Sequence, residues 1–233
     1  MNKGFDYNTE DIYISNNNLT YTEIENIKKE INEIKSKLAK NNLTPSQKGN
    51  LFEEYIEKIL KLNEKDIKIS KNVRTSDNEL DFYLKLTLDA KMKRSREIIP
   101  SYIPDHIIFE CKNYNEKLPI TYINKFYSIL IAKSYKMGIL LSYNGITGED
   151  KVGWSEGAGF IKKINLLALH YQELSCIENK MCPLKKKYPY LCYVNKDKIK
   201  NLENENYNLF EWIDDLVEET KVDVLMDFSN SHS

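Results

Sequence analysis

Two short apolar segments, separated by a helical pattern, constrain the fold of this chain more than any other feature. Residues 106–112, within the stretch DHIIFECKNY, and residues 137–142, MGILLS, have the composition of buried strands. Between them, residues 121–136 carry apolar side chains at helical spacing. A strand, a helix and a second strand in this order require a crossover connection, which favours parallel pairing at the centre of a sheet.

The flanking segments add further elements to this unit. Residues 78–88, NELDFYLKLTL, alternate between apolar and polar side chains, which predicts a strand with one buried face. A helix is predicted within 151–162, and the apolar stretch INLLAL, residues 164–169, is interpreted as another strand. Nearer the C-terminus, residues 188–194 favour a strand and residues 208–219 a helix. Together these elements predict an α/β fold.

The first part of the chain is interpreted as an extension of this domain. Residues 1–19 are polar and rich in Asn, and from about 20 to 41 apolar residues recur at spacings of three and four. These residues are Ile24, Ile27, Ile31, Ile34 and Leu38. Such a helix either packs on its own domain or pairs with a second copy as a short coiled coil. We place an N-terminal segment at 1–43 and a domain at 44–233, with its core at about 45–170.

The helix predicted after residue 44 carries two adjacent glutamates that face different ways. Thr44 is a candidate N-cap, Pro45 suits the first helical position, and Gln47 completes a capping box. At 100° per residue, Glu53 falls on the apolar side of this helix and Glu54 on the solvated side. Glu53 is therefore a candidate inward-facing carboxylate, and the alternative is an ordinary surface glutamate.

The apolar strand at 106–112 ends in an acid and a base on the same face. Side chains two residues apart in a strand share a face, so Glu110 and Lys112 stand side by side about 7 Å apart. Burial of either charge alone would be costly. A hard divalent cation such as Mg²⁺ would balance the acids, and Asp81, on the polar face of the preceding strand, is the natural second ligand.

Two carboxylates and a lysine in this arrangement suit metal-assisted hydrolysis of a phosphate ester. The cation would stabilise charge on the phosphate and acidify a water molecule. Lys112 would position and deprotonate that water, or neutralise the charge of the transition state. The alternative interpretation is an edge strand that carries a surface ion pair between Glu110 and Lys112.

With NELD in one strand and IIFECKNY in the next, the sequence resembles the PD-(D/E)XK, or restriction-endonuclease-like, nucleases. GNLFE at 49–53 is similar to their first helix, and ILLSYNGITG at 139–148 is similar to a later strand and loop of Mrr-like members. The resemblance spans about residues 45–170. In this sequence Leu80 stands where the family name has proline, and residues 88–104 are inserted between Asp81 and Glu110.

The resemblance implies both a fold and an activity. The fold is a mixed sheet between helices, and the catalytic trio is Asp81, Glu110 and Lys112. Glu53 would be an auxiliary metal ligand beside Asp81 and Glu110, or would orient a water. The implied reaction is Mg²⁺-dependent phosphodiester hydrolysis, with Mn²⁺ as a possible substitute, by an endonuclease that cuts DNA in restriction or anti-phage defence.

The resemblance leaves other functions open. A subunit with this fold could bind nucleic acid or assemble without cutting, and the attack on a phosphate does not separate DNA from RNA. Because a double-strand cut generally needs two active sites, a homodimer through residues 20–41 is a reasonable expectation. A partner protein could instead supply specificity, since no zinc finger and no obvious helix-turn-helix is visible in the sequence.

Two further sets of residues are candidate binding sites. The stretch KMKRSR lies in residues 88–104, which are interpreted as an irregular loop beside the catalytic strands, and it would grip phosphates or form an ordinary solvated loop. Its basic residues are Lys91, Lys93, Arg94 and Arg96. A zinc site is the second candidate, although its spacing fits no tight knuckle. Its residues would be His170, Cys176, Cys182 and Cys192.

Charge and hydropathy limit the remaining possibilities. The net charge of −1 favours no particular partner, so any nucleic-acid surface has to be a local patch. The sequence has no run of about 18 apolar residues and no signal-peptide core at its polar N-terminus, which argues against a membrane location. Four cysteines in 233 residues form no dense disulfide framework, so a reducing cytoplasm is expected.

Overall fold

The computed structural model describes residues 19–40, 42–62, 66–74, 79–149, 154–177, 188–203 and 208–230, excepting the side chains of 170–177 and 223–230. The helices are α2 (Tyr21–Leu38), α3 (Pro45–Lys61), α4 (Leu88–Ser95), α5 (Ile120–Ala132), α6 (Glu156–Ile177), α7 (Lys196–Ile199) and α8 (Leu209–Asn230). The strands are β1 (Ile67–Arg74), β2 (Glu79–Leu86), β3 (His106–Lys112), β4 (Met137–Ser142) and β5 (Tyr190–Val194).

The five strands form one mixed sheet in the order β1-β2-β3-β4-β5. The first three strands pair antiparallel, whereas β3 pairs with β4, and β4 with β5, in parallel. The crossovers between the parallel strands carry α5 and α6. The predicted parallel centre is confirmed, and the chain is an α/β protein with a mixed sheet flanked by helices.

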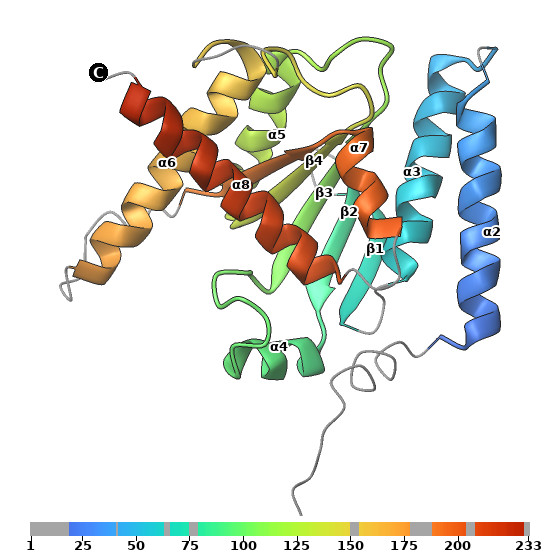
Figure 1. Ribbon diagram of the computed structural model, residues 1–233, viewed down its shortest axis with the longest axis horizontal. Helices are drawn as coiled ribbons and strands as arrows, with labels where there is room; N and C mark the ends of the chain where they lie inside the picture. The colour runs from blue at the N-terminus through green and yellow to red at the C-terminus, as the bar shows by residue number, and fades with distance from the viewer. Residues whose placement is uncertain are drawn as a thin grey trace, which may run out of the picture.

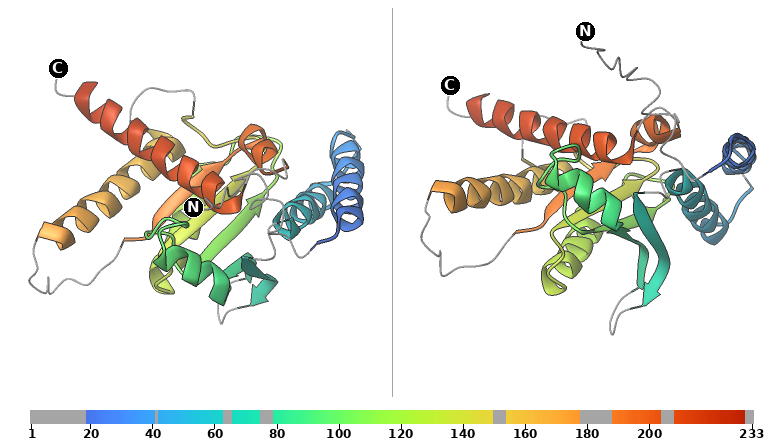
Figure 2. Two further views of the ribbon diagram at one scale, coloured as in Figure 1. Left: turned by 60° about the horizontal axis from the view of Figure 1, so that its bottom comes forward. Right: turned by 90° about the horizontal axis from the view of Figure 1, so that it is seen from below.

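Helices cover both faces of this sheet. One apolar layer joins the sheet to α2, α3 and α8, and a second layer joins the opposite face to α5 and α6. Figure 1 shows α8 crossing in front of the strands, and Figure 2, in its right view, shows α8 and α5 on opposite sides of the sheet. The central strands β3 and β4 are therefore enclosed, which explains why their sequences are almost continuously apolar.

The heptad-patterned helix packs on its own domain. Ile31 and Ile34 of α2 are buried, and Ile24, Ile27 and Leu38 contact the same apolar layer. Figure 1 shows α2 alongside α3 at the margin of the molecule. A homodimer stays a prediction, and it would have to use another surface, because this seam is already occupied within the chain.

Local signals explain most of the helix boundaries. Thr44 and Gln47 form the predicted capping box at the start of α3. By contrast, the irregular loop predicted for residues 88–104 is wrong, because its first part is helix α4. The hydroxyl of Thr87 caps α4 by accepting a hydrogen bond from the amide of Ala90 at 3.2 Å.

The strand predicted at residues 164–169 is also wrong, because INLLAL lies inside α6. Ala158, Ile161, Ile164 and Ala168 are buried at helical spacing, so helical periodicity prevails over the apolar run. Strand β5 and helix α8 also contribute to the apolar core.

Asn165 of α6 shows how the outer edge of β5 is protected. Its side chain is buried and donates to the carbonyl of Leu191 at 2.8 Å, while its own carbonyl oxygen accepts from the amide of Leu191 at 3.0 Å. The amide side chain thus pairs with the strand as a neighbouring strand would. Within the described residues, no helix is long and apolar enough to cross a membrane.

Candidate active site

Strands β2 and β3 bring the two predicted carboxylates together. Phe82 of β2 is paired with Phe109 of β3, and continuing this antiparallel register by one residue sets Asp81 opposite Glu110. The Asp81 carboxylate leans across to β3, where its Oδ2 accepts a hydrogen bond of 2.6 Å from the amide of Cys111. This bond fixes the carboxylate beside the end of the central strand.

Lys112 completes the group predicted from the sequence. Its Nζ lies 2.6 Å from Oε1 of Glu110 and 3.6 Å from Oδ2 of Asp81, and it donates to the carbonyl of Cys111 at 3.0 Å. Because both carboxylates lie near the same Nζ atom, Asp81 and Glu110 are close to each other. Asp81 and Glu110 side chains are each 15% exposed. The alternative of a surface ion pair on an edge strand is wrong, because β3 is the middle strand of the sheet.

The electrostatics of this group are not fully compensated. Burial raises the pKa of Glu110, the charge of Asp81 raises it further, and Lys112 opposes both effects. Oε2 of Glu110 is buried without a hydrogen-bond partner. Burial by itself would lower the pKa of Lys112, but the charges of Glu110 and Asp81 outweigh it and raise that pKa. The ammonium of Lys112 therefore stays protonated and acts as a fixed positive charge.

Helix α3 contributes a third carboxylate from the neighbouring layer. Glu53 is partly buried while Glu54 is exposed, which confirms the predicted facing of the two glutamates. Burial, followed by the charge of Asp81, raises the pKa of Glu53, and the charges of Lys71 and Lys112 lower it. These influences place Glu53 in the same electrostatic group as Asp81 and Lys112.

Lys71 of β1 is a residue of this region that the sequence analysis missed. Its Nζ lies 3.9 Å from Oε2 of Glu53 and 3.2 Å from Oε2 of Glu57, and 5.7 Å from the centre of the Phe82 ring. Strand β1 was not predicted, because only its first residues alternate and Asn72 interrupts it with a positive φ of 52°. A Lys facing the glutamates of α3 could not be recognised without that strand.

The residues that the structure describes include no ready-made group of three His, Cys, Asp or Glu side chains arranged around a metal position. The carboxylates nevertheless fit a divalent cation. Glu110 presents a buried oxygen without a donor, and Asp81 lies beside it on the adjacent strand. One or two protein carboxylates are the usual complement for Mg²⁺, which keeps several waters. Asp81 and Glu110 would hold the ion, and Glu53 lies toward Lys71.

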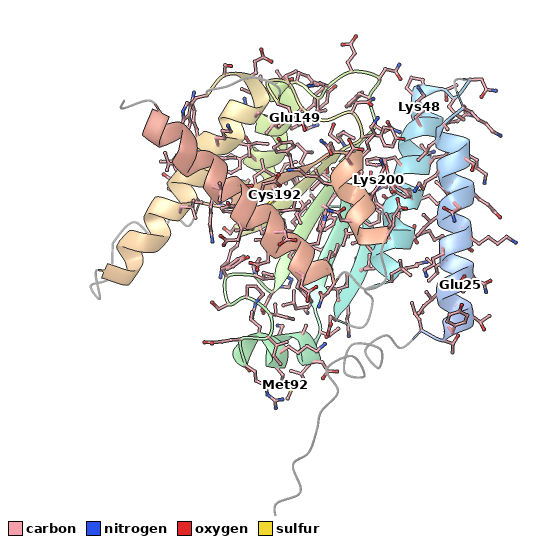
Figure 3. All side chains as sticks on the ribbon, viewed as in Figure 1. Glu25, Lys48, Met92, Glu149, Cys192 and Lys200 are labelled. Carbon is pink, nitrogen blue, oxygen red and sulfur yellow. The ribbon has the colours of Figure 1, made fainter. Side chains whose placement is uncertain are left out.

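The basic segment lies at the other end of the strands. At the start of β3, the amide of Leu86 donates to the carbonyl of Asp105, and Lys85 is paired with His106. Helix α4, which follows β2 there, is therefore about 20 Å along β3 from Lys112. Figure 3 shows Met92 of α4 and Lys48 of α3 at opposite ends of the molecule. The segment adjoins β2 and β3, as predicted, but at the end away from Lys112, and its role in binding phosphates stays a prediction.

Three of its four basic side chains are engaged in ion pairs within the chain. Lys91 and Arg94 both lie 2.5 Å from the Asp105 carboxylate, and Lys93 lies 2.8 Å from that of Asp66. Arg96 is exposed. Lys91 and Arg94 thus fasten α4 to the residue before β3, and Lys93 fastens it to the residue before β1.

The rim of the candidate site is formed by the loop after β3. Asn113 donates to the carbonyl of Lys48 at 3.1 Å, and the Lys48 ammonium donates to Asn115 at 2.8 Å. Between these residues lies Tyr114, whose hydroxyl pKa is raised by a hydrogen bond with Tyr122 and by burial. The charges of Lys112 and Glu110 also act on that hydroxyl, so Tyr114 lies near the catalytic group.

The zinc hypothesis falls mostly on residues outside the described part of the chain. These are the side chains of His170 and Cys176, and the whole of Cys182. Cys192 is fully buried in β5 as a core residue, as expected. Comparison of the chain with protein-family models, with curated proteins and with solved structures finds no match in any of the three.

Proposed function

We propose that this protein is a metal-dependent endonuclease that hydrolyses phosphodiester bonds in DNA. The observation that carries the proposal is the meeting of Asp81, Glu110 and Lys112 at the end of the central strand, with one Glu110 oxygen buried and unpartnered. A buried charge without full compensation is costly, and such groups are concentrated at functional sites. The mixed sheet and the order of these residues support a restriction-endonuclease-like fold.

In this proposal each side chain has a separate role. Asp81 and Glu110 would hold a magnesium ion, which would supply positive charge at the phosphate and acidify a water. Lys112, held protonated by the same carboxylates, orients the attacking water and stabilises the negative charge that develops on the phosphate oxygens. The two carboxylates raise its pKa, which favours this positioning role over that of a base.

Glu53 is better suited than Lys112 to the proton transfer. Burial and the nearby Asp81 raise its pKa, and a carboxylate with a raised pKa is a better base than an ordinary surface glutamate. The water oxygen bonds to phosphorus, its proton passes toward Glu53 or solvent, and the bond to the leaving oxygen breaks. Lys71 keeps the Glu53 side chain on the sheet side of α3.

A role in restriction or anti-phage defence, with a homodimer or a partner protein supplying target choice, belongs to the same proposal. It rests on the resemblance to restriction-endonuclease-like nucleases alone. The cytoplasm is the corresponding proposed location.

Incubation of the purified chain with supercoiled plasmid, linear DNA and RNA tests the reaction. We expect nicked or linear plasmid in Mg²⁺ or Mn²⁺ and intact plasmid in EDTA. Cleavage of RNA in place of DNA would change the substrate, and intact DNA and RNA under every metal would favour a subunit that binds or assembles without cutting. Cleavage that persists in EDTA would contradict the metal-dependent mechanism.

A further inference from the structure

Two exposed tyrosines stand at the rim of the candidate active site. Tyr114 is two residues beyond Lys112, and Tyr122 lies in the first turn of α5. Each residue is 40% exposed, and their ring centres are 5.2 Å apart with the planes tilted by 42°. The pair therefore presents exposed aromatic surface close to Lys112 in the sequence.

Tyr114 stands on a loop that is already ordered by hydrogen bonds, and Tyr122 stands on helix α5. The carbonyl of Tyr114 accepts a bond of 2.6 Å from the side chain of Asn144, and the neighbouring Asn113 and Asn115 are both bonded to Lys48. Farther along, the amide of Leu118 donates to the carbonyl of Gly145 at 2.9 Å. A ring fixed in this way loses little conformational entropy when a flat ligand stacks on it.

Lysines and carboxylates both lie around the two rings, since Lys112 is paired with Glu110 and Glu116 follows Tyr114 by two residues. Lys112 lies two residues before Tyr114, and Lys125 lies three residues after Tyr122 on the same side of α5, close enough for its charge to act on Glu110. Lys48 is bonded to the neutral side chain of Asn115, so its charge is not cancelled by that contact. Aromatic rings interleaved with lysines beside a phosphate site suit a nucleic-acid strand, whose phosphates and bases alternate.

The spacing between Lys112 and Tyr114 bears on whether the bound nucleic-acid strand is single or paired. From Lys112 to Tyr114 the backbone spans at most about 7 Å, close to two base steps of 3.4 Å along one DNA strand. A base in a duplex is stacked and paired, so its flat face is not available to a side chain, whereas an unpaired base can splay out and stack on an aromatic ring. A phosphate at Lys112 therefore places an unpaired base within reach of Tyr114.

We propose that Tyr114 and Tyr122 form a stacking platform for an unpaired base next to the scissile phosphate, so that the enzyme acts on single-stranded segments of DNA. The inference rests on the proposed function, because the phosphate is placed at Lys112. It assigns a specificity-determining role to residues that the catalytic group does not require.

Binding measured without cleavage tests this platform. Fluorescence anisotropy in EDTA compares a labelled oligonucleotide, single-stranded or annealed to its complement, on the wild type and on the Tyr114→Ala/Tyr122→Ala double variant. We expect the wild type to prefer the single strand, and the double variant to lose about 5- to 150-fold in single-strand affinity, the range of base–aromatic stacking. Duplex affinity should change little.

Two controls separate stacking from folding. Tyr21→Ala removes an exposed aromatic residue at the start of α2 and should leave both affinities unchanged. The ring-preserving Tyr114→Phe/Tyr122→Phe variant should restore the single-strand preference that the alanine variant loses. A wild type that prefers the duplex, or an alanine variant that binds the single strand as tightly as the wild type, would overturn the inference.

The binding assay also distinguishes this inference from the proposed reaction. Tyrosine-dependent binding of the single strand without cleavage under any metal would support the platform while rejecting the nuclease. Cleavage in Mg²⁺ that is unaffected by loss of both rings, with equal use of single and double strands, would support the nuclease while rejecting the platform.

Discussion

The two ends of strands β2 and β3 both carry clusters of charged residues, but the clusters differ in how their charges are balanced. At the α4 end, Lys91, Arg94 and Asp105 pair directly, and the Asp105 side chain is 37% exposed. At the other end, Asp81, Glu110 and Lys112 are more deeply buried, and one Glu110 oxygen has no partner. Ion pairing accounts for the first cluster, which we call the clasp (Lys91, Arg94 and Asp105). It does not fully account for the second cluster.

The two clusters also differ in how conspicuous they are in the sequence. The run KMKRSR is conspicuous in the sequence, yet most of its charges are engaged in ion pairs that fasten α4. The pair Glu110 and Lys112 is inconspicuous, yet it lies at the end of the middle strand, where burial makes an incomplete ion pair costly. Partial burial with incomplete compensation is therefore the feature on which the proposed site rests, rather than the density of basic residues.

The largest expected difference between the two ends is in how their charges affect the free energy of unfolding. Replacing the pair by apolar residues of similar size, Glu110→Leu with Lys112→Met, should leave stability unchanged or raise it by about 1–4 kcal/mol, because an incompletely compensated buried pair is removed. Chemical denaturation of the wild type and the double variant measures this change.

The single variant Lys112→Met is the matched control for that experiment. It leaves Glu110 and Asp81 together without their positive charge and should be less stable than the double variant. A double variant that loses more than about 1 kcal/mol relative to the wild type would show that the pair is a structural element like the clasp at α4.

The clasp itself should contribute less, and in a pH-dependent way. Hydrogen bonds from Lys91 and Arg94 lower the pKa of Asp105 to about 2. A lowered folded-state pKa means that the stabilisation is present above the unfolded value of about 3.9 and is lost as the pH falls through about 2. Because the carboxylate is more than a third exposed, the contribution should stay below about 1 kcal/mol.

Urea denaturation of the wild type and of Asp105→Asn, from about pH 6 toward about pH 2, measures that contribution. The difference between the two proteins should shrink as the pH falls. A difference that grows on acidification, or one that is independent of pH, would contradict the assignment of these charges to a simple surface clasp.

Much of the site could be predicted because it depends on local periodicity. Two-residue alternation in a strand is enough to put Glu110 and Lys112 on one face, and the turn of 100° per residue in a helix is enough to separate Glu53 from Glu54. The same alternation separates Asp81 from the buried Leu80 and Phe82. These relations hold whatever the rest of the fold does.

The errors arose where tertiary context decides the outcome. INLLAL is compatible with a strand or a buried helix, and its place after the first turns of α6 makes it helical. The position of α4 depends on where the turn between β2 and β3 lies relative to the catalytic residues, which charge patterning does not reveal. Lys71 lies near the site because β1 places it there. The polar second half of β1 makes that strand difficult to recognise in the sequence.

The cleavage rate of a matched pair of lysine variants tests the central claim most directly. Lys112→Met removes a buried positive charge between two carboxylates, and Lys93→Met removes one at the α4 end, paired with Asp66. In Mg²⁺ we expect Lys112→Met to cleave DNA at least about 100-fold more slowly than the wild type and Lys93→Met to cleave at the wild-type rate. A folded Lys112→Met variant with wild-type activity would contradict the account.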